Sequence, residues 1–275
     1  MSIRCIALDL DRTTLNEQGK LSPGNREALI CAIQKGVHIV IASGRSFSAL
    51  PEDVLRVPGI EYAITSNGAA IYHLPTGSCL RRVTMTPASV RQMLELTARF
   101  PIVYEAFVAG KAYADADYVQ DPLAHGATPQ ALSYIQRTRQ PIADMPHFLL
   151  EHDCALDSVD LVVPDQTVKR ELHALLAQQV PDLYITSSVP ELLELSHREG
   201  GKHHGVRFLA DTLGLTSDQI AAFGDGDNDA DLLSYVGCGI AMENATPGCK
   251  AAADRITLHH AQDGVAYGIH RYLGL

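Results

Sequence analysis

The stretch that decides the fold is IRCIALDLDRTT, residues 3–14. Its apolar run from Ile3 to Leu10 contains β-branched side chains and is too short for a buried helix, which predicts a buried central strand. Two carboxylates, Asp9 and Asp11, stand where that strand ends. Because open parallel sheets bind ligands at the carboxyl ends of their strands, this stretch predicts both an α/β fold and the place of a site.

The segments that follow support a parallel sheet. Residues 23–35 have apolar side chains at helical spacing, with Ser22 as N-cap and Pro23 at the first helical position. Val37 to Ala42 then predicts a second apolar strand. A strand, a helix and a strand in succession favour parallel strands joined by a right-handed crossover.

The order of predicted helices and strands changes in the middle of the chain. Between residues 87 and 197 two predicted helices alternate with pairs of short strands, which is typical of an antiparallel sheet with helices on one face. The stretch 115–157 contains several prolines and predicts no clear elements. From Gly200 helices and strands alternate again, as they do at the start of the chain. We therefore expect a Rossmann-like core domain of residues 1–82 and 190–275, with an inserted α+β domain at residues 83–189.

Composition narrows the classes of partner. The chain has 275 residues and a net charge of −10, from 32 acidic and 22 basic residues. Since nucleic acids are bound through lysine and arginine contacts to phosphate, we expect no nucleic-acid partner. No Cys-x-x-Cys pair suggests zinc, and no apolar run approaches the roughly 20 residues of a membrane span. We expect a cytoplasmic protein, monomeric by default, that binds no membrane.

A second acidic cluster, residues 224–229 (GDGDND), also follows a predicted strand. Crowded carboxylates repel one another and require a cation, and hard oxygen ligands with room for phosphate suit Mg²⁺. Two further features are weak when taken alone. Ser43 and Gly44 follow the second strand, where a hydroxyl and backbone N–H groups form an anion cradle. Lys202 begins a predicted helix after two glycines.

These four segments, in this order, resemble the motifs of the haloacid-dehalogenase-like (HAD) phosphatases, and specifically their Cof-type branch with a class IIB cap. Asp9 to Thr13 matches the Asp-x-Asp-x-Thr motif, Ser43 the second motif, Lys202 the third, and residues 224–229 the fourth. Residues 65–69 (TSNGA) are also similar to this branch. The resemblance covers essentially the whole chain.

The resemblance implies a Mg²⁺-dependent hydrolase of small phosphomonoesters, such as sugar phosphates. Asp9 would attack phosphorus and form an aspartyl-phosphate, and Asp11 would act as general acid and base. The implied metal ligands are Asp9, Asp225 and the backbone carbonyl of Asp11. The phosphoryl group would be held by Ser43, Gly44, Lys202 and Asn228. Asp229 would orient Lys202 or a water bound to the metal.

The sequence departs from the family pattern at three places. Arg12 and His203 occupy positions where glycine is usual, and residues 196–201 lack the usual proline-lysine-glycine sequence. Two other functions remain open. One is a phosphomutase or phosphotransferase, which passes the phosphoryl group to a hydroxyl other than water. The other is a non-enzymatic phosphate or Mg²⁺ sensor, which would have no need of the second carboxylate, Asp11. The sequence does not name the substrate, the cap residues that select it, or the oligomeric state.

Overall fold

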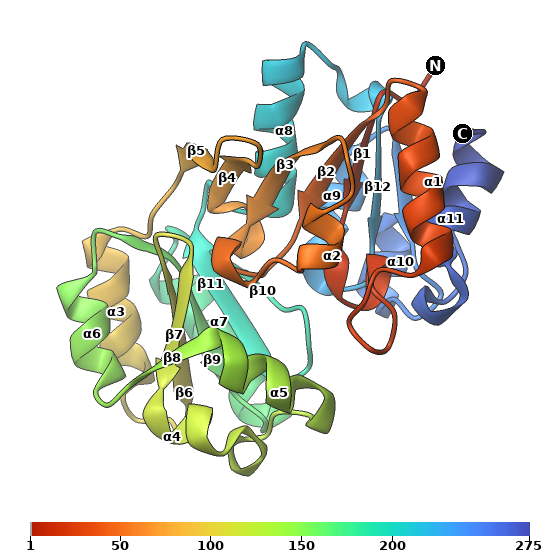
Figure 1. The fold of residues 1–275 in the computed structure, drawn as a ribbon. Helices are drawn as coiled ribbons and strands as arrows, with labels where there is room; N and C mark the ends of the chain where they lie inside the picture. The colour runs from red at the N-terminus through yellow and green to blue at the C-terminus, as the bar shows by residue number, and fades with distance from the viewer. Residues whose placement is uncertain (1) are drawn as a thin grey trace. The chain divides into compact units, whose positions relative to one another are not determined.

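The computed structural model describes residues 2–275 and divides into two compact units. Of the described residues, unit 1 comprises 2–45, 50–81 and 201–275, and unit 2 comprises 46–49 and 82–200. Each unit has its own sheet and its own covering helices (Figure 1).

The sheet of unit 1 has the strand order β14-β13-β12-β1-β2-β3-β4-β5. The strands from β14 to β3 run parallel, and β3 and β4 are antiparallel. The predicted central strand is thus confirmed, because β1 lies between β12 and β2. The bounds are β1 Cys5–Leu8, β2 His38–Ala42, β3 Ile60–Thr65, β4 Ala70–His73, β5 Ser78–Arg82, β12 Ile220–Gly224, β13 Cys238–Ala241 and β14 Arg255–Ile256.

Helices cover this sheet for reasons that are visible in the sequence. Helix α1 (Pro23–Gln34) begins where the Ser22 side chain accepts a hydrogen bond from the Asn25 N–H, as predicted. It lies beside α11 (Gly264–Gly268), whose Ala266 N–H donates to the Asn25 side chain. The other helices of the unit are α2 Glu52–Leu55, α8 Lys202–Leu213, α9 Ala230–Tyr235 and α10 Pro247–Ala252.

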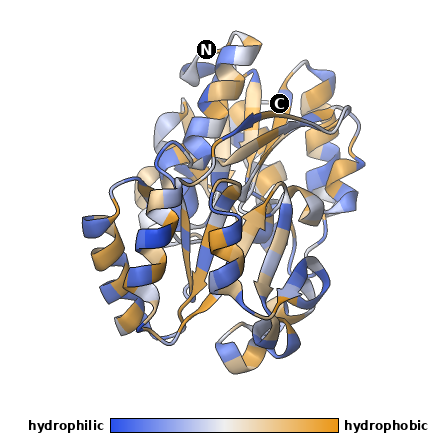
Figure 2. Cartoon of the chain, turned by 90° about the vertical axis from the view of Figure 1, so that its left-hand side faces the viewer, coloured by the Kyte–Doolittle hydropathy of each residue, from blue (hydrophilic) through white to orange (hydrophobic). Residues whose placement is uncertain are grey.

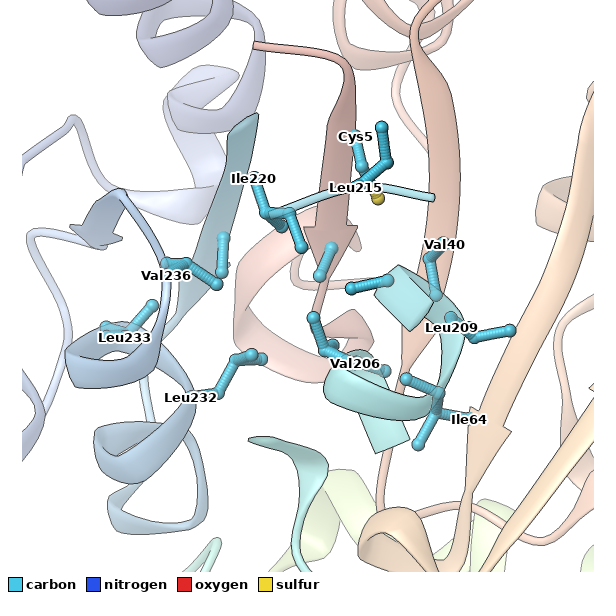
Figure 3. Close-up of a cluster of buried hydrophobic side chains, with 14 of the residues drawn as sticks. Cys5, Val40, Ile64, Val206, Leu209, Leu215, Ile220, Leu232, Leu233 and Val236 are labelled. Carbon is cyan, nitrogen blue, oxygen red and sulfur yellow. The ribbon is translucent and has the colours of Figure 1, made fainter. Parts of the chain in front are cut away.

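An apolar cluster packs α8 and α9 against the strands (Figure 3). Val206 and Leu209 of α8 and Leu232 of α9 meet Val40 and Ile220 of the sheet, and all five side chains are at most 2% exposed. Each large aliphatic side chain buried in this way stabilises the fold by about 1.5–3 kcal/mol. The cluster therefore fixes the start of α8 relative to the strand ends.

The sheet of unit 2 has the order β10-β11-β9-β6-β7-β8. It is antiparallel except for the parallel pair β7 and β8. Its strands are β6 Val103–Val108, β7 Lys111–Asp115, β8 Arg139–Ile142, β9 Leu156–Val162, β10 Leu183–Thr186 and β11 Leu192–His197. Its helices are α3 Pro87–Thr97, α4 Ala116–Gln120, α5 Pro129–Thr138, α6 Met145–Glu151 and α7 Gln166–Gln179.

Helices lie on both faces of this second sheet, which corrects the expectation of one covered face. Side chains of α3, α6 and α7 join the apolar cluster that contains Leu161. Tyr118 of α4 and Ile135 of α5 pack with Val162, whose side chain points to the opposite face. The stretch 115–157, which predicted no clear elements, supplies α4, α5, α6 and strand β8.

The expected second boundary, between residues 189 and 190, falls too early. Strand β11 pairs with β9 and β10, so the chain remains in the second sheet until His197 and in unit 2 until Gly200. The chain at Val189 and Pro190 only reverses direction between β10 and β11 of one sheet. Residues 46–49 also belong to unit 2, where the Ser48 N–H donates to the Gly110 carbonyl.

Helices with both hydrophilic and hydrophobic residues are a general feature of the chain (Figure 2). This pattern is expected where one side of a helix packs on a sheet and the other faces water. Within residues 2–275, no helix has the length and apolar character that crossing a membrane requires.

Candidate active site

The two acidic motifs lie side by side in the structure. Strands β1 and β12 are parallel neighbours, with Leu8 opposite Phe223, so Asp9 and Asp225 both stand just beyond that edge of the sheet. The Asp9 N–H donates to the Phe223 carbonyl at 3.1 Å. Both aspartates are buried, with 6% and 4% of their surface exposed. The topology therefore brings together two motifs that are far apart in the sequence.

Lys202 joins the same cluster. It is the first residue of α8 and is only 1% exposed. Its ammonium donates to Asp9 Oδ1 at 2.6 Å and to Asp229 Oδ1 at 2.7 Å. A buried ammonium persists where such partners compensate its desolvation. Burial by itself lowers the pKa of Lys202, but the Asp229 and Asp9 carboxylates outweigh burial and raise that pKa above its ordinary value.

Asp229 folds back over the loop that carries it. Its Oδ2 accepts the backbone N–H groups of Asp225 at 3.0 Å and Gly226 at 3.1 Å, while its Oδ1 accepts Lys202. Gly224 makes this approach possible, because a Cβ there would lie 2.4 Å from the Asp229 Cβ. Any other residue at 224 would displace the carboxylate that holds Lys202.

Three carboxylates of this cluster are placed to hold a metal ion. Asp9, Asp225 and Asp229 each offer a ligand oxygen, and these oxygens all lie within 4.8 Å of one another. Burial, followed by repulsion from Asp229, raises the pKa of Asp225 to about 7, and burial also raises the pKa of Asp9. With one ammonium for three carboxylates, the cluster has a surplus of negative charge. Its hard oxygen donors and its charge both fit Mg²⁺.

Asp11 lies outside this cluster of carboxylates. It follows β1 in the irregular turn Leu10–Thr14, and its side chain is 55% exposed. Arg45 donates to both of its oxygens, from Nε at 2.7 Å and from Nη2 at 2.6 Å. A bidentate salt bridge of this kind neutralises a carboxylate and also fixes its orientation. The expected contribution of Asp11 to a metal site, through its backbone carbonyl, stays a prediction.

Ser43 and Asn228 meet through a third residue, Asn67. Ser43 follows β2, the other neighbour of β1, and its carbonyl accepts the Asn67 N–H at 3.1 Å. The Asn228 side-chain amide donates to Asn67 Oδ1 at 3.0 Å. Ser66 and Asn67 have φ values of 47° and 50°, in the left-handed region where residues other than glycine are uncommon. The structure thus brings two of the predicted phosphate-binding residues to one turn, and Gly44 follows Ser43 directly.

A family model for haloacid dehalogenase-like hydrolases matches residues 6–269. The chain belongs to this family. Phosphatase YwpJ of Bacillus subtilis is 28% identical over 282 residues, which cover 96% of this chain and 98% of the relative. The 5-amino-6-(5-phospho-D-ribitylamino)uracil phosphatase YwtE of the same organism is 28% identical over 304 residues, which cover 98% of each chain.

A solved structure of the same fold is the HAD subclass IIB sugar phosphatase BT4131. Its TM-score is 0.83, its sequence identity is 18%, and the match covers 98% of this chain and 99% of that one. The α/β fold and the resemblance to the HAD-like phosphatases are confirmed, and the protein is a phosphatase.

Three side chains in this HAD-like site were not assigned a role from the sequence. Thr13 Oγ1 donates to Asp225 Oδ1 at 3.0 Å, Arg45 pairs with Asp11, and Asn67 holds Asn228. Thr13 and Asn67 lie within segments that resemble the family, which was a usable signal. Arg45 also lies in such a segment, but its pair with Asp11 was not predictable, because a pair formed across a loop depends on side-chain direction.

Proposed function

We propose that this phosphatase hydrolyses small phosphorylated metabolites in a Mg²⁺-dependent reaction that passes through an aspartyl-phosphate on Asp9. The observation that supports it best is the buried Lys202, which bridges Asp9 and Asp229 beside Asp225. A cation between two carboxylates, next to a third, is suited to receiving a phosphoryl group and neutralising its charge. When bound, Mg²⁺ would be held by Asp9 and Asp225 and would offset the repulsion between a carboxylate nucleophile and phosphate.

Asp9 has the geometry of a nucleophile. Within residues 2–275 the hydrogen bond to its carboxylate falls on Oδ1, from Lys202. Oδ2 is therefore available to attack phosphorus. The backbone is fixed as well, because Thr14 Oγ1 donates to the Asp9 carbonyl at 2.6 Å. Because one carboxylate oxygen and the backbone carbonyl of Asp9 are both held, the side chain has little orientational freedom to lose before it reacts.

Two bond exchanges complete the proposed cycle. In the first, Asp9 Oδ2 forms a bond to phosphorus, the ester P–O bond breaks, and Asp11 gives its proton to the leaving oxygen. In the second, Asp11 takes a proton from water, whose oxygen attacks phosphorus and frees Asp9 and inorganic phosphate. Asp11 is half-exposed and must leave the Arg45 guanidinium to reach the leaving group.

Lys202, Ser43, Gly44 and Asn228 are proposed to hold the transferring phosphoryl group. Lys202 supplies charge, Ser43 a hydroxyl and Asn228 an amide. Ser43 and Asn228 are at most 5% exposed, so their donors lie in a water-poor environment. In such surroundings a preorganised donor stabilises the developing charge more strongly than in water.

The substrate is proposed to be a phosphomonoester of a small metabolite. In support, relative YwtE is named for a phosphorylated ribitylaminouracil. The choice among sugar phosphates and related compounds stays open, as do the role of unit 2 as a cap, the cytoplasmic location and the monomeric state.

The test is phosphate release from a panel of phosphorylated metabolites, with Mg²⁺ and with chelator. Asp9→Asn keeps the shape of the side chain but removes the nucleophile, and we expect no release. Asp227→Asn, an exposed position in the same loop as Asp225, is the matched control and should keep activity. Mass spectrometry after acid quench should detect one added phosphoryl group in the wild type and none in Asp9→Asn. Release that persists in Asp9→Asn would refute the assignment of the nucleophile.

A further inference from the structure

Arg12 stands in a backbone conformation that favours glycine. Its φ and ψ are 59° and 12°, within the turn that follows β1. Side chains at such φ values cost free energy, and the family pattern has glycine here. Because an outlier of this kind persists only where other contacts hold it, the contacts of Arg12 indicate what the side chain does.

Two contacts hold Arg12 beside the acidic cluster. Its carbonyl accepts the Asn244 side-chain amide at 2.9 Å, and its Nη2 donates to the Asn244 carbonyl at 3.4 Å. Its Nε then lies 3.5 Å from Asp225 Oδ2. The Arg12 side chain is 46% exposed, whereas that of Asp225 is 6% exposed. A cation is thus tethered at the water side of a buried carboxylate.

The charge balance of the acidic cluster shows why the contact of Arg12 with Asp225 matters for metal binding. Asp9, Asp225 and Asp229 offer three negative charges and Lys202 offers one positive charge, so a metal ion would meet two surplus negative charges. Arg12 cancels one of them. It does so at Asp225, which is a proposed metal ligand and makes no contact with Lys202 among the ion pairs of residues 2–275.

We propose that Arg12 is a built-in cation that opposes Mg²⁺ at Asp225 and thereby sets a weaker metal affinity than the same site would have with glycine at this position. The inference rests on the proposed Mg²⁺ dependence of the enzyme. In the metal-free protein the guanidinium stabilises the carboxylates, and in the metal-bound protein it repels the ion. Arg12 is a positioning residue in this account and takes no part in bond making.

The size of the effect follows from Coulomb's law. A Mg²⁺–oxygen bond is about 2.0–2.1 Å, so an ion on Asp225 Oδ2 would lie within about 6 Å of Arg12 Nε, given the 3.5 Å contact. Because the guanidinium is half-exposed, water and salt screen the repulsion. With the dielectric constant of water and 0.1 M salt, one charge repels a divalent ion enough to weaken binding roughly three- to tenfold.

The test is Mg²⁺ binding by isothermal titration calorimetry, with the metal alone as the probe and no substrate. Arg12→Gln removes the charge and keeps a side chain of similar length. Arg12→Lys keeps the charge. Arg56→Gln removes an exposed arginine that pairs with Glu52 on the surface and is the matched control. Thermal unfolding with and without Mg²⁺ provides a second reading of affinity and checks that each variant is folded.

We expect Arg12→Gln to bind Mg²⁺ roughly three- to tenfold more tightly than wild type, while Arg12→Lys and Arg56→Gln stay close to it. Equal affinity of wild type and Arg12→Gln would overturn the inference and leave the proposed function intact. Weaker binding by Arg12→Gln would also overturn it, since Arg12 would then support the ion. If neither protein binds Mg²⁺, the metal requirement of the proposed function fails, and this inference fails with it.

Discussion

Replacing Lys202 by methionine removes the ammonium that holds the acidic cluster together. Methionine has similar length and is apolar, so packing at the start of α8 changes little. Asp9 and Asp229, which receive the Lys202 donors at 2.6 and 2.7 Å, then remain buried beside Asp225 without their counter-ion.

The loss in the free energy of unfolding that Lys202→Met causes can be bounded from the structure. Removing one partner of a buried ion pair costs about 3–5 kcal/mol, because an uncompensated charge stays behind. We expect the lower end, about 3 kcal/mol, since a carboxylate can take up a proton instead; the pKa of Asp225 is already raised to about 7 by burial. Loss of a preorganised donor to the phosphoryl group should also lower kcat about 100- to 1,000-fold.

Urea unfolding at neutral pH, with and without Mg²⁺, measures the stability, and steady-state phosphate release measures kcat. Mg²⁺ should return a large part of the lost stability, because it supplies the missing positive charge at the same carboxylates. Lys35→Met, at an exposed position after α1, is the control and should change neither quantity.

A Lys202→Met variant with wild-type stability and no response to Mg²⁺ would refute the electrostatic account of the cluster. If stability falls as expected but kcat is unchanged, the structural role of Lys202 would hold and its proposed contact with phosphate would not.

Asp160→Asn should raise the thermal unfolding midpoint at pH 7, because burial, and next repulsion from two acidic neighbours, holds the pKa of Asp160 well above its usual range. A raised folded pKa means that the folded state binds the proton more tightly, so wild-type stability should increase as pH falls from neutral toward about 4, and the variant should lose that increase. Gly224→Ala should destabilise the protein by about 1–3 kcal/mol and lower kcat, because the new Cβ would lie 2.4 Å from the Asp229 Cβ. Denaturant titration and phosphate release measure the two effects. Asn67→Ala should lower kcat by about tenfold with little change in KM, since it removes the acceptor of the Asn228 amide; a pure rise in KM would contradict this role.

Much of the fold was predictable because local patterns carry it. The apolar run before Asp9 predicted an interior strand, and β1 lies between two parallel neighbours. The predicted start of a helix at Lys202 is also the start of α8. The first segment is a short apolar run and the second begins directly after two glycines, so short windows of sequence suffice.

The remainder depended on contacts between distant residues. The expected boundary after residue 189 falls too early, because strand pairing, which no local pattern shows, keeps β11 in the second sheet. The pair of Asp11 with Arg45 follows from side-chain directions that no spacing rule gives. Motif order placed Asp9, Lys202 and Asp229 in one site. It did not predict that one ammonium would bridge both carboxylates.

The pairing of β1 with β12, Cys5 opposite Ile220, has a consequence for how the chain folds during synthesis. Unit 2 is built from contiguous sequence apart from residues 46–49, whereas β1 must wait for a strand made much later. At about 5–20 residues per second, that delay is on the order of ten to forty seconds. In this interval one edge of a highly apolar strand is without its partner. A chaperone that binds nascent chains should therefore protect the N-terminal segment longest, and the acidic cluster should be among the last parts of the molecule to form.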